Sequence, residues 1–230
     1  CLKADPDYTR AMYNLAYIYN DIYKYDSSLY YYKMLYHLVP LNASVAYEIG
    51  LSYYYSYDYD SSIVYLERAL TLNNKNADYY AKTGDAYFDG APDKINKTAY
   101  YQKAIDYYSG ALHLDSTLYL SMNRLGVACI YLEKYDEGAR IFELVLQKDA
   151  VYKNIYEYNL ACISSLQKKT APAMDYIERS FKSGYTDLAH ITVDTDLDNI
   201  RRLPEFKAVI QKYFKAEQIN KYPGLFGKTN

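Results

Sequence analysis

The sequence predicts an all-α fold, a right-handed α-solenoid of about five helix-turn-helix hairpins with a C-terminal helical cap. The chain aligns with itself at a spacing of 34 residues, so that successive repeats start at Thr9, Ala43 and Ala77. Apolar residues recur every three or four positions, which is typical of helices with one buried face. Small residues occupy the eighth slot of every repeat, at Ala16, Gly50, Gly84, Gly126 and Ala161.

A second column of small residues lies at the twentieth slot, where the second helix of each hairpin begins: Ser28, Ser62, Ala104, Gly138 and Ala173. Because both columns are small, the two helices of a hairpin can approach closely. Large residues follow four positions later and should fill the space beside that contact, as close packing requires: Tyr32, Leu66, Tyr108, Phe142 and Ile177. One hairpin cannot bury its apolar face alone, so neighbouring hairpins must stack.

The predicted elements follow in order: the tail of a preceding repeat at 1–8, repeats at 9–42, 43–76, 77–118, 119–152 and 153–183, a helical cap at 184–214 and a loose tail at 215–230. The third repeat carries an insertion at 88–98, in which Gly90 and Pro92 indicate a loop. A stack needs a cap with one polar side to cover its last apolar face. Its inward residues should be Leu203, Phe206, Val209, Ile210 and Phe214.

The first residues fit the same register, since Cys1 and Pro6 occupy slots that later repeats fill with similar residues. We therefore expect the chain to continue from an earlier repeat of a longer protein; a lipid-bearing amino-terminal cysteine is the alternative for Cys1. Any targeting region would then precede Cys1. The sequence indicates a soluble domain of bacterial type, and it does not distinguish the cytoplasm from the periplasm.

The repeat columns resemble the tetratricopeptide (TPR) family pattern, which is aromatic–x2–Leu–Gly–x2–Tyr, then Ala–x3–Phe, then Pro. The resemblance covers about residues 1–181, with Pro40 closing the first repeat. Segment 184–214 is similar to the ending of many bacterial members, a short Asp-Leu-Asp helix followed by a Pro-Glu-Phe helix. Tyr23 and Tyr57 stand in the turn between the two helices, where the family often has glycine.

The resemblance implies a scaffold that binds a protein or an extended peptide in a groove lined by the first helix of each hairpin. The family's groove slots carry over to Arg10, Tyr13, Asn14, Tyr17, Asn20, Tyr47, Glu48, Tyr54, Lys82, Asp85, Asn123, Arg124, Tyr158 and Asn159. Glu48 and Leu51 depart from the family's clamp for a C-terminal carboxylate, so the mixed charges favour a mixed-charge peptide over a strongly acidic one.

Composition and motifs exclude several other functions. The formal net charge is −2, so the sequence lacks the positive field that attracts nucleic acid. No apolar run is long enough to span a membrane. The histidines are far apart and no phosphate loop, HExxH or GxSxG motif occurs, so we expect no catalytic residues, no enzyme activity and no cofactor.

One acidic stretch has the spacing of a calcium-binding loop, with Asp194, Asp196 and Asp198 followed by Glu205. Arg201 places a positive charge inside that loop, and Asn199 replaces the required glycine. The cysteines are too scattered for a zinc site. The sequence therefore predicts no metal site.

Two further readings of function stay open. The chain is an assembly module that self-associates through its open N-terminal face, or it is the regulatory part of a larger enzyme or sensor. The count of 34 tyrosines with no tryptophan is also open to two interpretations. Tyrosine replaces other aromatic residues by compositional drift, or it is selected for recognition, since it offers a large contact area and a hydroxyl group with few rotatable bonds.

Overall fold

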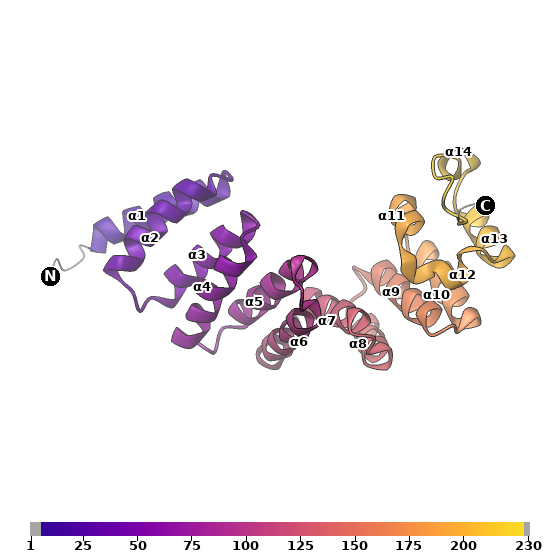
Figure 1. The fold of residues 1–230 in the computed structure, drawn as a ribbon, viewed down its shortest axis with the longest axis horizontal. Helices are drawn as coiled ribbons and strands as arrows, with labels where there is room; N and C mark the ends of the chain where they lie inside the picture. The colour runs from indigo at the N-terminus through magenta and orange to yellow at the C-terminus, as the bar shows by residue number, and fades with distance from the viewer. Residues whose placement is uncertain (1–5, 228–230) are drawn as a thin grey trace. The chain divides into compact units, whose positions relative to one another are not determined.

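The computed structural model describes residues 6–227, and within that range it contains helices, turns and loops but no strand (Figure 1). The fold is all-α, as predicted. The chain divides into an N-terminal unit, Cys1–Ser121, and a C-terminal unit, Met122–Asn230. Within the described range, no helix combines the length and the apolar character that crossing a bilayer requires.

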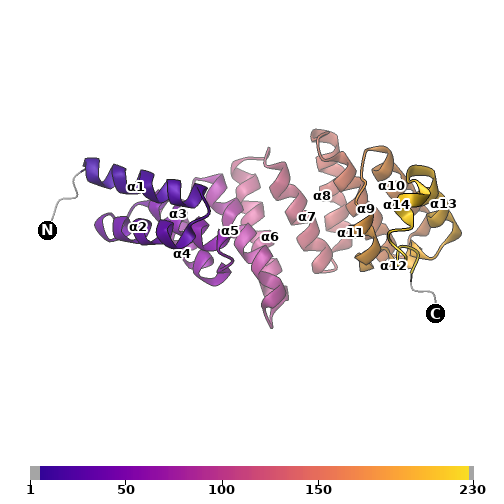
Figure 2. The same cartoon turned by 90° about the horizontal axis from the view of Figure 1, so that it is seen from above.

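The N-terminal unit consists of antiparallel helical hairpins that are connected by short turns (Figures 1 and 2). The hairpins are α1 (Pro6–Asp21) with α2 (Tyr25–Leu38), α3 (Ala43–Tyr55) with α4 (Tyr59–Leu72), and α5 (Ala77–Gly90) with α6 (Lys97–Leu114). Asparagine side chains cap several N-termini, because their oxygens accept backbone N–H groups that lack a partner in the first turn. Asn42 caps α3, Asn76 caps α5 and Asn96 caps α6.

The division between the units falls within α7 (Tyr119–Tyr131). The C-terminal unit continues with α8 (Tyr135–Lys148), α9 (Lys153–Leu166) and α10 (Thr170–Lys182). The cap follows as α11 (Leu188–Val193), η2 (Thr195–Leu197), α12 (Asp198–Arg201), α13 (Pro204–Tyr213) and α14 (Ala216–Ile219). In the cap, Phe206 and Ile210 are fully buried and Phe214 nearly so, whereas Leu203 and Val209 are partly buried.

Small residues of the first helix lie directly against large residues of the second, as predicted. A Cβ atom added to Gly50 would lie 2.6 Å from Leu66, one on Gly84 would lie 2.7 Å from the Tyr108 ring, and one on Gly126 would lie 2.6 Å from the Phe142 ring. Leu66, Tyr108 and Phe142 have no exposed surface. The core of each unit is therefore built from contacts in which the backbone of one helix meets a large side chain of its partner.

The turn inside a hairpin places one residue in the left-handed backbone region, where a side chain is strained. This residue is Tyr23, Tyr57, Glu133 or Lys168, with φ of 61°, 64°, 57° and 59°. The backbone N–H of each bonds the carbonyl group three residues earlier, which closes the end of the first helix. This turn position therefore favours glycine, whereas the first two hairpins have Tyr23 and Tyr57 at it.

The insertion of the third repeat packs against the second hairpin. Helix α5 continues to Gly90, whose added Cβ would lie 2.9 Å from the Tyr59 side chain. The short 3₁₀ helix η1 (Ala91–Asp93) follows, and Lys94 Nζ reaches the Asp60 carboxylate at 2.6 Å. The chain becomes helical again at Lys97, so the insertion is one turn of helix and a loop.

The predicted segments at the two ends of the chain, 1–8 and 215–230, are described only in part. Helix α1 already begins at Pro6, and residues 1–5 of the predicted 1–8 segment lie outside the described residues. The predicted loose tail, 215–230, is ordered through residue 227, because Leu225 is fully buried in the core of the cap. Its Pro and Gly residues indicate a loop, but they give no signal that one leucine inserts into the cap.

We predict that Gly126→Ala lowers the free energy of unfolding by about 1–3 kcal/mol, because the new methyl group forces the buried Phe142 ring to move. The gain in helix propensity from glycine to alanine, about 1 kcal/mol, offsets only part of this cost. Chemical denaturation followed by circular dichroism measures the change. The control is Gln147→Ala on the exposed surface of α8, and a Gly126 variant as stable as the control would contradict the packing.

Candidate peptide-binding surface

All of the predicted groove residues of the N-terminal unit lie on α1, α3 and α5, on what we call the first-helix face. Tyr13 and Glu48 meet on this face, where the Tyr13 hydroxyl group donates to Glu48 Oε1 at 3.1 Å. The Tyr32 hydroxyl donates to the other carboxylate oxygen at 3.4 Å. Burial raises the pKa of Glu48 above its usual value, and the two hydrogen bonds oppose that shift. Tyr13 also contacts the Tyr32 ring edge-on, so it is a packing residue as well as a surface residue.

A pocket of about 400 Å³ opens on this face where the first hairpin meets the second. It is lined by Tyr17, Asn20, Asp21, Tyr23, Tyr25, Glu48, Leu51 and Tyr55. We call it the junction pocket. Tyr17, Asn20 and Glu48 are groove residues that the sequence predicts. The sequence places Tyr23 only in a turn, and the signal for a further role is a tyrosine at a position that favours glycine.

The equivalent place between the second and third hairpins is occupied by the chain's own side chains. Lys82 Nζ forms an ion pair with Asp85 at 2.8 Å and lies 5.8 Å from the centre of the Tyr54 ring. Asp85 also accepts from the buried Tyr108 hydroxyl at 3.0 Å, and Tyr54 donates to Asp89. These three predicted groove residues, Tyr54, Lys82 and Asp85, are therefore engaged with one another and with the core. Tyr47 stacks on Tyr79 at 4.5 Å.

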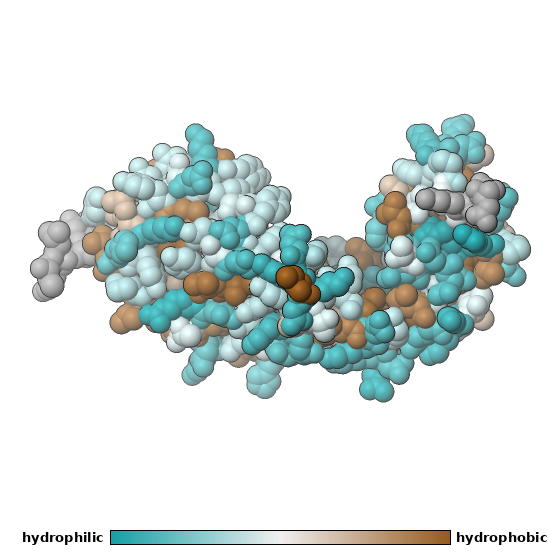
Figure 3. All heavy atoms as spheres, viewed as in Figure 1, coloured by the Kyte–Doolittle hydropathy of each residue, from teal (hydrophilic) through white to brown (hydrophobic). Residues whose placement is uncertain are grey.

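The remaining predicted residues of α1 differ in exposure. Arg10 and Asn14 are exposed, and Asn20 Oδ1 accepts a long hydrogen bond of 3.4 Å from the Ser52 hydroxyl. Tyr17 is 53% exposed. Figure 3 shows only small areas of strongly hydrophobic surface on the visible face of the molecule.

The C-terminal unit brings Asn123 and Asn159 together, since Asn159 Nδ2 donates to Asn123 Oδ1 at 3.1 Å. Arg124 lies beside Asn123 on α7 and is partly buried. Tyr158 differs from the prediction, because the cap covers it and leaves only 2% of its surface exposed. Its ring stacks on Tyr185 at 4.4 Å and its hydroxyl donates to Asp194 at 2.6 Å. Tyr158 is a contact between α9 and the cap, and it is not available to a ligand.

Three potential metal ligands lie close together under the cap. The Cys162 thiol group and the carboxylates of Asp194 and Asp196 each have one ligand atom within 4.8 Å of the others. Asp194 already accepts from the Tyr158 hydroxyl, the Cys162 thiol and the Asp196 backbone N–H. Burial, with Asp194 nearby, holds the Cys162 pKa well above its usual value, so this sulfur is a protonated donor. We therefore assign no metal to this group.

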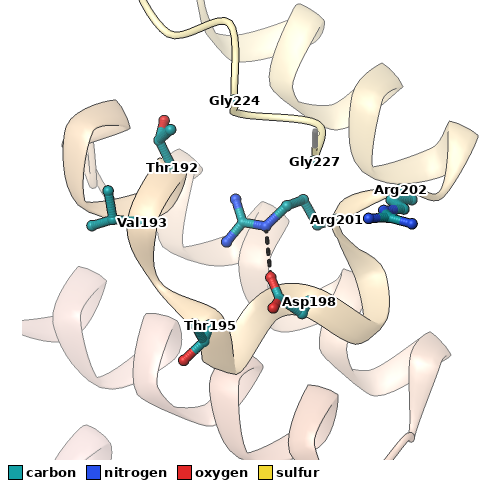
Figure 4. A pocket seen from close by; sticks show the side chains of 8 residues that line it. All are labelled: Thr192, Val193, Thr195, Asp198, Arg201, Arg202, Gly224 and Gly227. Carbon is teal, nitrogen blue, oxygen red and sulfur yellow. Dashed lines mark hydrogen bonds and ion pairs between the residues drawn. The ribbon is translucent and has the colours of Figure 1, made fainter. Parts of the chain in front are cut away.

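A second cavity, of about 570 Å³, lies within the cap and is lined mainly by residues of α11, α12 and the C-terminal segment (Figure 4). Arg201 crosses it and is only 4% exposed. Its Nε donates to Asp198 at 3.0 Å, and its terminal nitrogens donate to the backbone carbonyl groups of Ile191, Asp194 and Leu225. The guanidinium group thus holds three chain segments together, and the cavity is part of the cap's architecture.

Comparison with known structures identifies the architecture. Crystal structures of MamA and of YrrB, described as a TPR protein with an unusual peptide-binding site, superpose with TM-scores of 0.66 and 0.64. Both are 17% identical in sequence, and the alignments cover 74% and 75% of this chain and 94% and 84% of those chains. The chain has the tetratricopeptide-repeat fold.

Two further comparisons are more limited in coverage. The first TPR domain of Spaghetti (RPAP3), bound to the HSP90 peptide SRMEEVD, matches 58% of this chain with a TM-score of 0.51, 18% identity and 99% of its own length. A chloroplastic protein of Arabidopsis thaliana is 29% identical over 100 residues, 41% of this chain. The matched region spans about 30% of the length of that plant protein. No family model matches the sequence.

The acidic pair under the cap of this TPR fold predicts a pH-dependent stability. Burial and the neighbouring Asp194 raise the pKa of Asp196 from 3.8 to about 6. The folded state therefore binds this proton more tightly than the unfolded state, and stability falls as the pH rises from about 4 to 6. Asp196→Asn should raise the free energy of unfolding at pH 7 by roughly 1 kcal/mol, a value reduced because the side chain is partly exposed.

The advantage of the Asp196→Asn variant should disappear below about pH 4, where the natural aspartate is protonated. Denaturation at several pH values measures it, and Asp93→Asn, an exposed aspartate of η1, is the control. An advantage that is constant across this pH range would contradict the raised pKa.

Proposed function

We propose that this chain is a non-catalytic scaffold that binds an extended peptide segment of a partner protein on the first-helix face of its N-terminal unit. The observation that carries this proposal is the junction pocket, which is open to solvent and lined by half-exposed tyrosines. Tyr17 and Tyr55 are 53% and 41% exposed, so their rings offer contact area that the fold itself does not use. Tyrosine surfaces of this kind suit peptide recognition.

The structural neighbours support the same class of function. YrrB is described with a peptide-binding site, and the RPAP3 domain is bound to a peptide. Asn14 and Asn20 lie on α1 beside the tyrosines, and asparagine can accept from and donate to a peptide backbone. The acidic side chains of the junction pocket, Asp21 and Glu48, would repel a strongly acidic peptide.

Peptide selection tests the proposal. A random peptide library displayed on phage is selected against the intact chain, and the affinities of the selected peptides are measured by fluorescence anisotropy. We expect Tyr17→Ala combined with Asn14→Ala to weaken binding about tenfold or more, since both side chains are exposed on α1 and the loss of one aromatic anchor costs about 1–2 kcal/mol. Helix content should stay unchanged.

The matched control is Tyr30→Ala on α2, a tyrosine that is 61% exposed but lies on the second helix of the same hairpin. The control should bind like the natural chain. Equal loss in the control and in the double variant would place the site elsewhere, and a failure to select any peptide would overturn the proposal.

One observation favours a second candidate function, self-association. Helix α1 exposes Leu15 and Ile18, and the turn that follows it exposes Ile22, at 37%, 55% and 48% of their surface, with the spacing of a single helical stripe. Such a stripe is typical of a helix that packs against another hairpin. We expect Ile18→Glu to reduce any concentration-dependent increase in mass seen by light scattering. A mass that stays monomeric at all concentrations would remove this candidate.

A further inference from the structure

The junction pocket combines aromatic rings with negative charge. Its lining includes Tyr17, Tyr23, Tyr25 and Tyr55 together with the carboxylates of Asp21 and Glu48, and none of its lining residues is a lysine or an arginine. Tyrosine ring faces attract cations through their quadrupole. Carboxylates form charge-assisted hydrogen bonds with ammonium and guanidinium groups. The composition therefore fits a cation and opposes an anion.

Three of the pocket's tyrosine rings contact one another. Tyr25 stacks on Tyr55 with centroids 6.1 Å apart, and Tyr23 contacts Tyr25 edge-on at 6.4 Å. Glu48 supplies a partly buried carboxylate that accepts from two tyrosine hydroxyl groups, which carry no charge to neutralise it. Asp21 is exposed, and within residues 6–227 its side chain has no hydrogen bond or ion pair.

At the next junction, between the second and third hairpins, a lysine of the chain itself lies among tyrosine rings and carboxylates. The residue 34 positions after Glu48 is Lys82, and its ammonium group lies over the Tyr54 ring and beside the Asp85 carboxylate. That junction thus carries its own cation among tyrosines and acids. At the first junction the same position carries a carboxylate, and the pocket lies beside it. Lys24 borders a neighbouring hollow with Asp26 and does not line the pocket.

The turn residue Tyr23 adds an exposed aromatic ring to the pocket at a strained backbone position. Tyr23 has φ of 61° and is 79% exposed, so its side chain gains little from packing while its backbone carries the strain of the left-handed region. Glycine would remove that strain. Tyr57, Glu133 and Lys168 share this backbone conformation, so the strain belongs to the hairpin turn, and Tyr23 is distinguished from them because it lines the pocket.

We propose that the junction pocket binds the basic side chain, arginine or lysine, of the peptide segment that sits on the first-helix face. This inference rests on the proposed function and specifies its ligand. The tyrosine rings contact the cationic group and its alkyl stem, and Asp21 and Glu48 neutralise its charge. The partner is accordingly a protein segment with an exposed basic residue in an extended stretch.

The direct test is a titration of the intact chain with blocked single amino acids, the N-acetyl methylamides of arginine, lysine, norleucine and glutamate, up to about 10 mM, a range that detects weak binding. Nuclear magnetic resonance spectra with labelled tyrosine report the ring signals. We expect arginine and lysine to shift the signals of pocket tyrosines and norleucine and glutamate to bind at least about tenfold more weakly. Equal shifts with norleucine, or none with arginine and lysine, would overturn the inference.

Charge variants identify the groups that act. Asp21→Asn and Glu48→Gln should each weaken arginine binding about threefold to fivefold, the range of a single ion pair. Glu48→Gln keeps one acceptor oxygen for one of the two tyrosine hydroxyl groups, Tyr13 or Tyr32, and removes the charge. Asp93→Asn removes the same charge from an exposed site outside the pocket and should bind like the natural chain. Unchanged affinity in both pocket variants would contradict the charge recognition.

A pair of turn variants separates binding from folding. Tyr23→Gly should raise the melting temperature, because it removes backbone strain, and should nevertheless weaken binding about threefold, because it removes one pocket wall. Tyr57→Gly is the matched control, since Tyr57 has φ of 64° and the same exposed fraction of 79% but does not line the pocket. It should raise the melting temperature without changing binding. Equal binding by both variants would remove Tyr23 from the site.

The library-selected peptides distinguish the failure of this inference from the failure of the proposed function. Peptides that bind through Tyr17 and lose affinity about tenfold when their basic residue becomes norleucine support both. Peptides that bind through Tyr17 without needing a basic residue leave the scaffold function standing and overturn the inference. If no peptide depends on Tyr17, both fail.

Discussion

The close approach of two helices within each hairpin is the contact on which the rest of the structure depends. It exists because a glycine or alanine on the first helix leaves room for a leucine, a tyrosine or a phenylalanine on the second, as at Gly84 and Tyr108. This contact fixes the direction in which the opposite side of the first helix points. The large residues of the second helix also reach this face, since the Tyr32 hydroxyl donates to Glu48 and the Tyr108 hydroxyl donates to Asp85.

Much of the fold could be predicted because these contacts recur at a fixed spacing. Small residues at Gly50 and Gly126 mark each pair of helices, and Pro204 with Phe206 marks the last cap helix. The ordering of the final segment could not be predicted. Leu225 stands between Gly224 and Phe226 in a stretch without periodicity, and its burial depends on a cavity made by segments that lie far away in the sequence.

The candidate site was predictable in part. Groove slots identified Tyr17, Asn20 and Glu48, since the side chains of a regular helix recur on one face. The same rule placed Tyr158 in the groove. It considers only the repeats, whereas Asp194 and Tyr185 of the cap contact Tyr158 and cover it. It also treated Lys82 and Asp85 as separate ligand contacts, whereas a spacing of three residues on a helix lets them bond to each other.

The placement of Arg201 has a consequence for how the C-terminal unit comes apart. One guanidinium group ties the carbonyl groups of Ile191, Asp194 and Leu225, so these three segments lose their shared donor together rather than one at a time. Local opening at this end is therefore expected to be cooperative, with a single threshold for amide hydrogen exchange across α11, η2 and the last turn. We therefore expect the three segments held by Arg201 to unfold together as one cooperative unit.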